Sequence, residues 1–318
     1  MRAKTMSRVT AVLLILMMAA GAAAAGKRDK RTLVFIAGPS SHGYGTHEHY
    51  AGFALLGRYL EKNVPGLRTV IHRGWPKEDG AFADADAVAI NCDGSEGHLI
   101  VPHLDQVAAL MKRGVGLALL HYATVVPKGD AGDRVRRWIG GCFETGWSVN
   151  PTWVAEFKRL PAHPITRGVR PFAIRDEWYY HMRFVDGMEG VAPILTAVPP
   201  DVTRRGKDGP YSGNPHVRAR MGRPEHVAWA RERPDGGRGF GFTGLHWHWN
   251  LAHDDFRRLL LNALVWVAGG EVPEGGVPSE RPNLDELTRD LGERPTTNWD
   301  AASVRKMIEA FGRKPADR

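Results

Sequence analysis

The chain has 318 residues, with 43 lysines and arginines against 35 aspartates and glutamates, which gives a net charge of +8 at pH 7. Acids and bases are interspersed without a basic block of the kind found in nucleic-acid-binding arms, so the sequence argues against a nucleic-acid partner. Two cysteines are too few for a disulfide framework, and the fold must therefore rest on an apolar core.

Residues 1–25 have the pattern of a secretory signal peptide. Three basic residues precede the apolar stretch Val9–Ala20, which is shorter than a membrane span requires, and Ala23–Ala25 fits a signal-peptidase site. We therefore expect an exported protein, periplasmic or extracellular, without stable membrane insertion after cleavage. Cleavage would remove three cations and no acids, lowering the net charge from +8 to +5. Export also permits a disulfide between Cys92 and Cys142, and their pairing stays open.

The first half of the chain predicts alternating strands and helices. One helix begins near Thr46, a residue type that caps helices, and a second ends at Gly114. The strands are short apolar runs at 32–38, 67–73, 86–91 and 115–120. Because the central runs are apolar throughout, both of their faces should be covered, as in a parallel sheet with helices on both sides.

The second half changes character, with three strand-like runs and no helices between them. These runs are 178–184, 191–198 and 225–232. They would extend the sheet or form a smaller antiparallel layer. The run 238–245 then returns to a core strand. A strongly amphipathic helix follows, with Asp254 or Asp255 as its cap and Gly269 as its end.

Beyond residue 270 the composition shifts to proline, glycine and charged residues. We expect a peripheral tail over 271–318, in which Asn283 and Asp300 are each suited to cap a short helix. The predicted organisation is a signal peptide at 1–25, one α/β domain at 26–270 and this tail.

Polar side chains follow several of the predicted strands. Ligands of open parallel sheets bind beyond the carboxyl ends of the strands, so these side chains should meet at one edge. They are His42 and His47 after the first strand, Asp93 after the third, His121 and Tyr122 after the fourth, and His246, Trp247 and His248 after the last. The sequence therefore predicts one site built largely from imidazoles.

Three kinds of chemistry fit such a site. We favour general acid–base catalysis, because histidines titrate near neutral pH and no cofactor is then required. A divalent metal such as zinc would use two or three imidazoles and a carboxylate, with His42, His47, His121 and His246 as candidate ligands. Nucleophilic catalysis is disfavoured, because Cys92 follows the third strand rather than the fourth and no G-x-S-x-G motif occurs.

Structural roles are the alternative for each of these residues. His42 or His47 can simply hydrogen-bond loop backbone, and Trp247 and its neighbouring tryptophan are better suited to packing than to sugar stacking. His248 would point to the same side as His246 only if the last strand continued. The remaining histidines considered are expected at the surface or as caps: His49, His72, His98, His103, His216, His226 and His253.

Asp176 and Glu177 precede an aromatic cluster that we expect to lie in the sheet. Carboxylates beside aromatic rings are costly unless they are paired. Glu177 could pair with a cation such as Arg183, or it could orient or protonate one of the histidines. We favour the second role.

Three stretches, read in order, resemble the ThuA-like (trehalose-utilisation) family. They are VGLALLHYA, HPITRGV followed by DEWYYH, and GFTGLHWHWN followed by DDFRRLLLNALVWVAGG. The similarity runs from about Thr32 to Gly270 and leaves the tail uncovered. It implies the class I glutamine amidotransferase-like fold, a flavodoxin-like α/β fold whose mostly parallel sheet carries helices on both faces.

Amidotransferases of this fold carry a cysteine nucleophile on a sharp turn after a strand and a later His-x-Glu pair. Here His121 stands where that cysteine would be, His246 matches the later histidine, and His248 replaces the glutamate. The resemblance therefore implies no glutaminase activity. The polar set kept by ThuA-like proteins corresponds to His42 or His47, His121, Glu177 and His246.

The family is associated with the catabolism of disaccharides, in particular oxidised (3-keto) trehalose-like sugars, which implies a small sugar as partner. Abstraction of a proton next to a keto group needs a base near neutral pH, which His121 or His246 could supply. The expected catalytic residues are His121, His246, Glu177 and His42, and the expected substrate contacts are His47, Asp93, Tyr122, Trp247 and His248. The alternatives are a non-catalytic sugar-binding protein and a zinc-dependent hydrolase on the same scaffold.

Overall fold

The computed structural model describes residues 30–292, 295–297 and 299–311, and the described residues from Arg31 onward form one compact unit. The expected signal peptide at 1–25 lies outside the described residues. Within the described part of the chain, no helix has the length and apolar character needed to cross a membrane.

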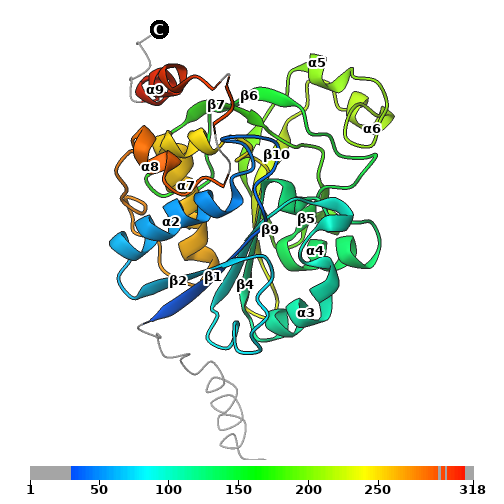
Figure 1. Cartoon of the computed structure of the whole chain (residues 1–318). Coiled ribbons are helices and arrows are strands. Elements are labelled where there is room, and N and C mark those ends of the chain that lie inside the picture. Colours follow the sequence, from blue (N-terminus) through cyan, green and yellow to red (C-terminus); the bar gives the residue numbers. More distant parts are fainter. Residues whose placement is uncertain (1–29, 293–294, 298, 312–318) are drawn as a thin grey trace, which may run out of the picture. The chain divides into compact units, whose positions relative to one another are not determined.

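A seven-stranded sheet forms the centre of this unit (Figure 1). Its strands, in spatial order, are β2 (Leu67–Arg73), β1 (Arg31–Ala37), β3 (Ala87–Asn91), β4 (Gly116–Leu120), β11 (Arg238–Phe242), β10 (Glu225–Glu232) and β9 (Val191–Ala197). The first five are parallel, and β10 and β9 extend the sheet in antiparallel pairing. The predicted α/β class with a mostly parallel sheet is confirmed.

Helices cover both faces of the sheet, because alternate side chains of each strand point to opposite faces. Leu33 and Phe35 of β1 join the core formed with α2 (His49–Asn63) and α7 (Asp254–Val267). The intervening residues of β1 join a second core with α3 (Leu104–Lys112) and α4 (Asp130–Ile139) on the other face (Figure 1). Cys92 and Cys142 are buried in this second core and unpaired.

The middle of the chain contains two small antiparallel pairs. They are β6 (Thr152–Phe157) with β7 (Phe172–Glu177), and β5 (Gly141–Cys142) with β8 (Arg183–Phe184). The predicted strand at 178–184 is therefore wrong over most of its length. Trp178, Tyr179 and Tyr180 are buried in an irregular segment, and the φ of +59° at His181 interrupts any extended path.

The remaining described helices are short. They are α5 (Asp201–Arg204), α6 (Pro215–Arg218), α8 (Leu284–Thr288) and α9 (Ala301–Ala310). The 3-10 turns are η1 (Ser95–Gly97), η2 (Val101–His103), η3 (His121–Thr124), η4 (Pro164–Thr166), η5 (Asp186–Met188) and η6 (His248–Ala252).

Helix caps were predicted with mixed success. Asn283 and Asp300 cap α8 and α9 as expected. The cap of α7 is His253 rather than an aspartate, since its Nδ1 accepts from the backbone N–H of Phe256. Thr46 does not cap α2, because the helix begins at His49 with Glu48 at the N-cap position. The Thr46 hydroxyl instead donates to carbonyls of the preceding turn.

The segment beyond residue 270 is less peripheral than its composition suggested. Val272, Val277, Leu284 and Leu287 are buried in the core that contains α2 and α7. Arg58 of α2 also pairs with a carboxylate of this segment. The predicted boundary at 270 therefore does not separate a tail from the domain.

Candidate functional site

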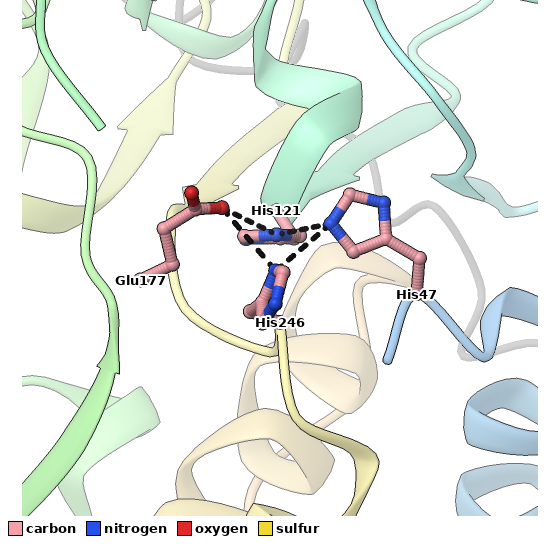
Figure 2. A group of neighbouring side chains, drawn as sticks. All are labelled: His47, His121, Glu177 and His246. Carbon is pink, nitrogen blue, oxygen red and sulfur yellow. Dashed lines mark hydrogen bonds and ion pairs between the residues drawn. The ribbon is translucent and has the colours of Figure 1, made fainter. Parts of the chain in front are cut away.

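Four side chains converge beyond the carboxyl ends of the strands (Figure 2). His47 Nε2 lies 3.0 Å from both His121 Nε2 and His246 Nδ1. Glu177 Oε2 lies 3.3 Å from His246 Nδ1 and 3.5 Å from His121 Nε2. We call these four residues the His–Glu cluster. The expectation that distant imidazoles gather at one rim of the sheet is thus met.

The protons of two of the imidazoles point away from the cluster. His121 Nδ1 lies 2.8 Å from the carbonyl oxygen of Thr243, and His47 Nδ1 lies 3.0 Å from Asp93 Oδ1. A carbonyl or carboxylate oxygen only accepts, so each Nδ1 carries the proton and donates it. The Nε2 lone pairs of both rings therefore face the centre of the cluster.

Burial keeps these imidazoles neutral. Burial holds the pKa of His121 well below 6.5, with repulsion from His47 and His246 adding to the effect. Burial also lowers the pKa of His47, although its hydrogen bond to Asp93 opposes the shift. Unprotonated nitrogens therefore dominate the cluster at neutral pH.

Backbone strain gathers around the same residues. Among the described residues, the non-glycine positions with positive φ include His42 (66°), His47 (44°), His121 (52°) and Leu245 (86°). Left-handed backbone is unfavourable for residues with a Cβ and persists only where surrounding contacts enforce it. His121 thus occupies a sharp turn directly after β4, which aims its ring into the cluster.

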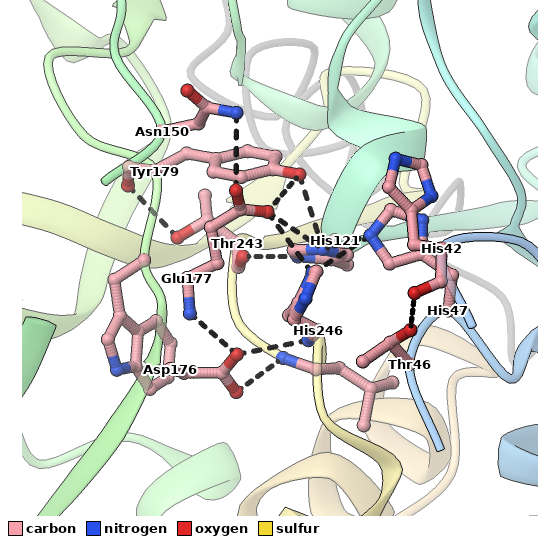
Figure 3. Close-up of polar contacts among 12 residues, drawn as sticks. His42, Thr46, His47, His121, Asn150, Asp176, Glu177, Tyr179, Thr243 and His246 are labelled. Atoms are coloured by element: carbon pink, nitrogen blue, oxygen red, sulfur yellow. Dashed lines mark hydrogen bonds and ion pairs between the residues drawn. The ribbon is translucent and has the colours of Figure 1, made fainter. Parts of the chain in front are cut away.

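Asp176 fixes the backbone that carries two cluster residues (Figure 3). Its Oδ1 accepts the N–H groups of Glu177 and His246, at 2.8 and 3.0 Å. Its Oδ2 accepts the N–H of Leu245 and the side-chain amide of Asn250, at 2.8 and 2.9 Å. Burial raises the pKa of Asp176, but a proton on either oxygen would displace one of these donors.

Two further residues hold the carboxylate of Glu177 (Figure 3). Tyr179 Oη lies 3.2 Å from both Glu177 Oε2 and His121 Nε2, and Asn150 Nδ2 donates to Glu177 Oε1 at 3.3 Å. Burial raises the pKa of Tyr179 well above 10, so its phenol keeps its proton. Neither residue was predicted from the sequence, because the segment after Glu177 is irregular and no periodicity indicates which of its side chains face the cluster.

The other predicted site residues lie around the cluster at various distances. His42 is exposed, with its ring 4.0 Å from that of His47 and its Nδ1 2.8 Å from Ser41 Oγ. Tyr122 lies at the side of the cluster, its ring 5.7 Å from that of His47. Trp247 is half-buried against His246, at 5.0 Å between ring centroids.

The structure decides two questions that the sequence left open, the direction of His248 and the partner of Glu177. His248 is buried away from the cluster, where its Nε2 lies 2.9 Å from the carbonyl oxygen of Leu287, because the strand had already ended at Phe242. Arg183 pairs with Glu144, which leaves Glu177 to the histidines. Among the histidines expected at the surface or as caps, His49 and His98 are instead fully buried with their Nδ1 or Nε2 bonded to backbone.

The His–Glu cluster fits a metal ion. Zinc–nitrogen bonds of about 2.0–2.1 Å place the corners of a tetrahedron about 3.3 Å apart. Four of the six distances between the cluster atoms are 3.0 to 3.5 Å, and all six are within 4.8 Å. Histidine ligands of metals usually donate their other N–H to a carboxylate or carbonyl, as His47 and His121 do here. His42, His47 and Asp93 form a second, more exposed group that shares His47.

Comparisons with known proteins found a matching family model and solved structures with a similar fold. Residues 41–267 match a protein-family model described as ThuA, trehalose utilisation. A solved protein from Bacteroides uniformis described as ThuA-like covers 79% of this chain and 98% of its own length, at 15% identity and a TM-score of 0.52. Another from Parabacteroides merdae covers 77% of this chain and 92% of its own length, at 13% identity and a TM-score of 0.51. No curated protein matches the chain.

Proposed function

The chain belongs to the ThuA, or trehalose-utilisation, family, and from that premise we propose a metal-dependent enzyme that acts on a modified (3-keto) disaccharide or glycoside. The family match supports carbohydrate catabolism. The metal is inferred from the His–Glu cluster, and the keto sugar from the association of the ThuA-like family with oxidised disaccharides.

The main support for a metal is that the Nε2 lone pairs of His47 and His121 face each other at 3.0 Å. Lone pairs at this distance repel unless a proton or a cation lies between them. A shared proton is disfavoured, because burial lowers the pKa of both imidazoles. A divalent cation satisfies both nitrogens together with His246 Nδ1 and Glu177 Oε2. The geometry therefore favours metal binding over the metal-free acid–base chemistry suggested by the sequence.

The donor set of three imidazoles and one carboxylate suits zinc. A bound divalent ion supplies Lewis acidity, which stabilises negative charge on a sugar oxygen. The first chemical step would remove a proton from the carbon next to the keto group, and the electron pair of that C–H bond would move to the carbonyl oxygen. The same step begins both isomerisation and elimination of a glycosidic oxygen.

His42 is the residue best placed to accept that proton. The other imidazoles of the site hold the metal, whereas His42 is exposed beside His47 and reachable by a ligand. Its Nδ1 contacts Ser41 Oγ, which in turn donates to Asp93 Oδ1 at 2.7 Å. This contact fixes the ring and leaves Nε2 free for the substrate.

Metal analysis and turnover measured together test the proposal. The mature protein would be assayed on native and 3-keto disaccharides, with and without chelator, beside His121→Ala and the exposed control His216→Ala. We expect about one metal per chain and turnover that chelation and His121→Ala abolish but His216→Ala preserves. Turnover that survives complete metal removal would restore the metal-free mechanism. Sugar binding without turnover of any sugar would instead indicate a binding protein.

Export belongs to the same proposal. Its support is the pattern of residues 1–25, a basic start, a short apolar stretch and an alanine-rich cleavage site. Mass spectrometry of the native protein should find an N-terminus close to Gly26. A mature chain that retains Met1 would contradict export by cleavage.

A further inference from the structure

The two oxygens of Glu177 have different surroundings. Oε2 faces His121 and His246, and it also lies 3.2 Å from the hydroxyl of Tyr179. Oε1 points away from the cluster toward the side-chain amide of Asn150, at 3.3 Å (Figure 3). A carboxylate whose two oxygens have separate donors cannot rotate freely.

The hydroxyl of Tyr179 has one proton and two acceptors within 3.2 Å, Glu177 Oε2 and His121 Nε2. When a metal occupies the Nε2 lone pair of His121, only the carboxylate oxygen remains as acceptor. The ring of Tyr179 is fixed for this contact, because it is buried between His121 and Phe143. The phenol therefore occupies one lone pair of Oε2 and leaves another for the metal.

The number of oxygens that Glu177 supplies decides whether the centre stays open. Three imidazoles and one carboxylate oxygen would give a bound metal four protein ligands, and the substrate would then add as a fifth. If Oε1 also bound the metal, it would take that fifth position. A restraint on Oε1 therefore keeps the substrate position free.

We propose that Tyr179 and Asn150 are positioning residues that restrict Glu177 to one-oxygen coordination and so reserve the fifth position for the sugar. This inference rests on the proposed metal function. Asn150 holds Oε1 away from the metal, and Tyr179 fixes the lone pair that Oε2 presents. Residues that orient metal ligands typically change metal affinity 10- to 100-fold when they are removed.

Cobalt substitution tests the inference without a known substrate. Co²⁺ replaces zinc in such centres, and its visible absorption differs between four and five ligands. The variants are Tyr179→Phe and Asn150→Ala, with Tyr180→Phe as the matched control. Tyr180 is an equally buried neighbour whose hydroxyl contacts Thr203 outside the cluster.

We expect Tyr179→Phe to weaken Co²⁺ binding by about 10- to 100-fold. Both Tyr179→Phe and Asn150→Ala should shift the spectrum toward five ligands, while Tyr180→Phe behaves as wild type. Wild-type affinity and spectrum in Tyr179→Phe and Asn150→Ala would overturn this inference and leave the proposed metal function standing. Failure of the wild-type protein to bind Co²⁺ or zinc would overturn the proposed function and this inference together.

Discussion

Replacing Asp176 by asparagine should be among the most damaging isosteric changes in the molecule. The carboxylate receives four N–H groups, two on each oxygen, and it is fully buried. Asparagine presents an NH₂ group in place of one oxygen, so either orientation of the amide leaves two buried donors facing a donor. An unsatisfied buried donor costs about 1–3 kcal/mol, which predicts a loss of about 2–6 kcal/mol.

Urea unfolding followed by tryptophan fluorescence would measure the change in the free energy of unfolding. The matched control is Asp300→Asn, an exposed helix cap at which the amide oxygen can still accept the N–H of Ala302. The predicted loss in Asp176→Asn should be accompanied by weaker zinc binding, because Asp176 fixes the backbone of Glu177 and His246. A loss below about 1 kcal/mol with unchanged zinc affinity would refute the reasoning.

Three further predictions concern the metal, pH and thiols. By elemental analysis, His47→Ala should abolish zinc retention and His42→Ala should preserve one zinc per chain, because His47 directs a lone pair into the cluster and His42 does not. Zinc loss in His42→Ala would contradict this. Burial lowers the pKa of His98 to about 4, below its unfolded value, so its contribution to stability is complete above about pH 6.5 and is lost as pH falls toward 4. The free energy of unfolding, measured across this pH range, should depend less steeply on pH in His98→Gln than in the wild type, by about 1.4 kcal/mol per pH unit. An unchanged dependence would contradict the lowered pKa of His98. Thiol titration without reductant should find Cys92 and Cys142 unreactive in the native protein and both reactive in denaturant, whereas no free thiols in denaturant would show a disulfide.

The strand pattern was readable from the sequence because buried strands are short, continuous apolar runs. The runs 67–73 and 225–232 coincide with β2 and β10, and the residue that follows β4 was correctly placed at the sheet edge. Such runs fix both the strand and the position of its last residue. His121 and His246 could therefore be placed together from chain order alone.

The rest of the site depends on side-chain directions that no periodicity determines. The segment after Glu177 is irregular, so nothing in the sequence could tell that Tyr179 faces the cluster while Tyr180 faces Thr203. The sequence also could not distinguish metal-free acid–base chemistry from metal binding. That distinction depends on which ring nitrogen of His121 meets the carbonyl of Thr243, a contact between residues 122 positions apart.

The contact between the first loop and the residues that connect α8 to α9 has a practical consequence for anyone who makes shortened versions of this protein. The family match stops at residue 267, yet the backbone N–H of Gly292 donates to Glu48, directly beside His47, and Trp299 packs on Tyr44 in the same loop. A fragment trimmed to the family boundary would discard residues that pack against the loop carrying His47, one of the four residues of the His–Glu cluster. Expression plasmids should therefore encode the chain at least through Phe311.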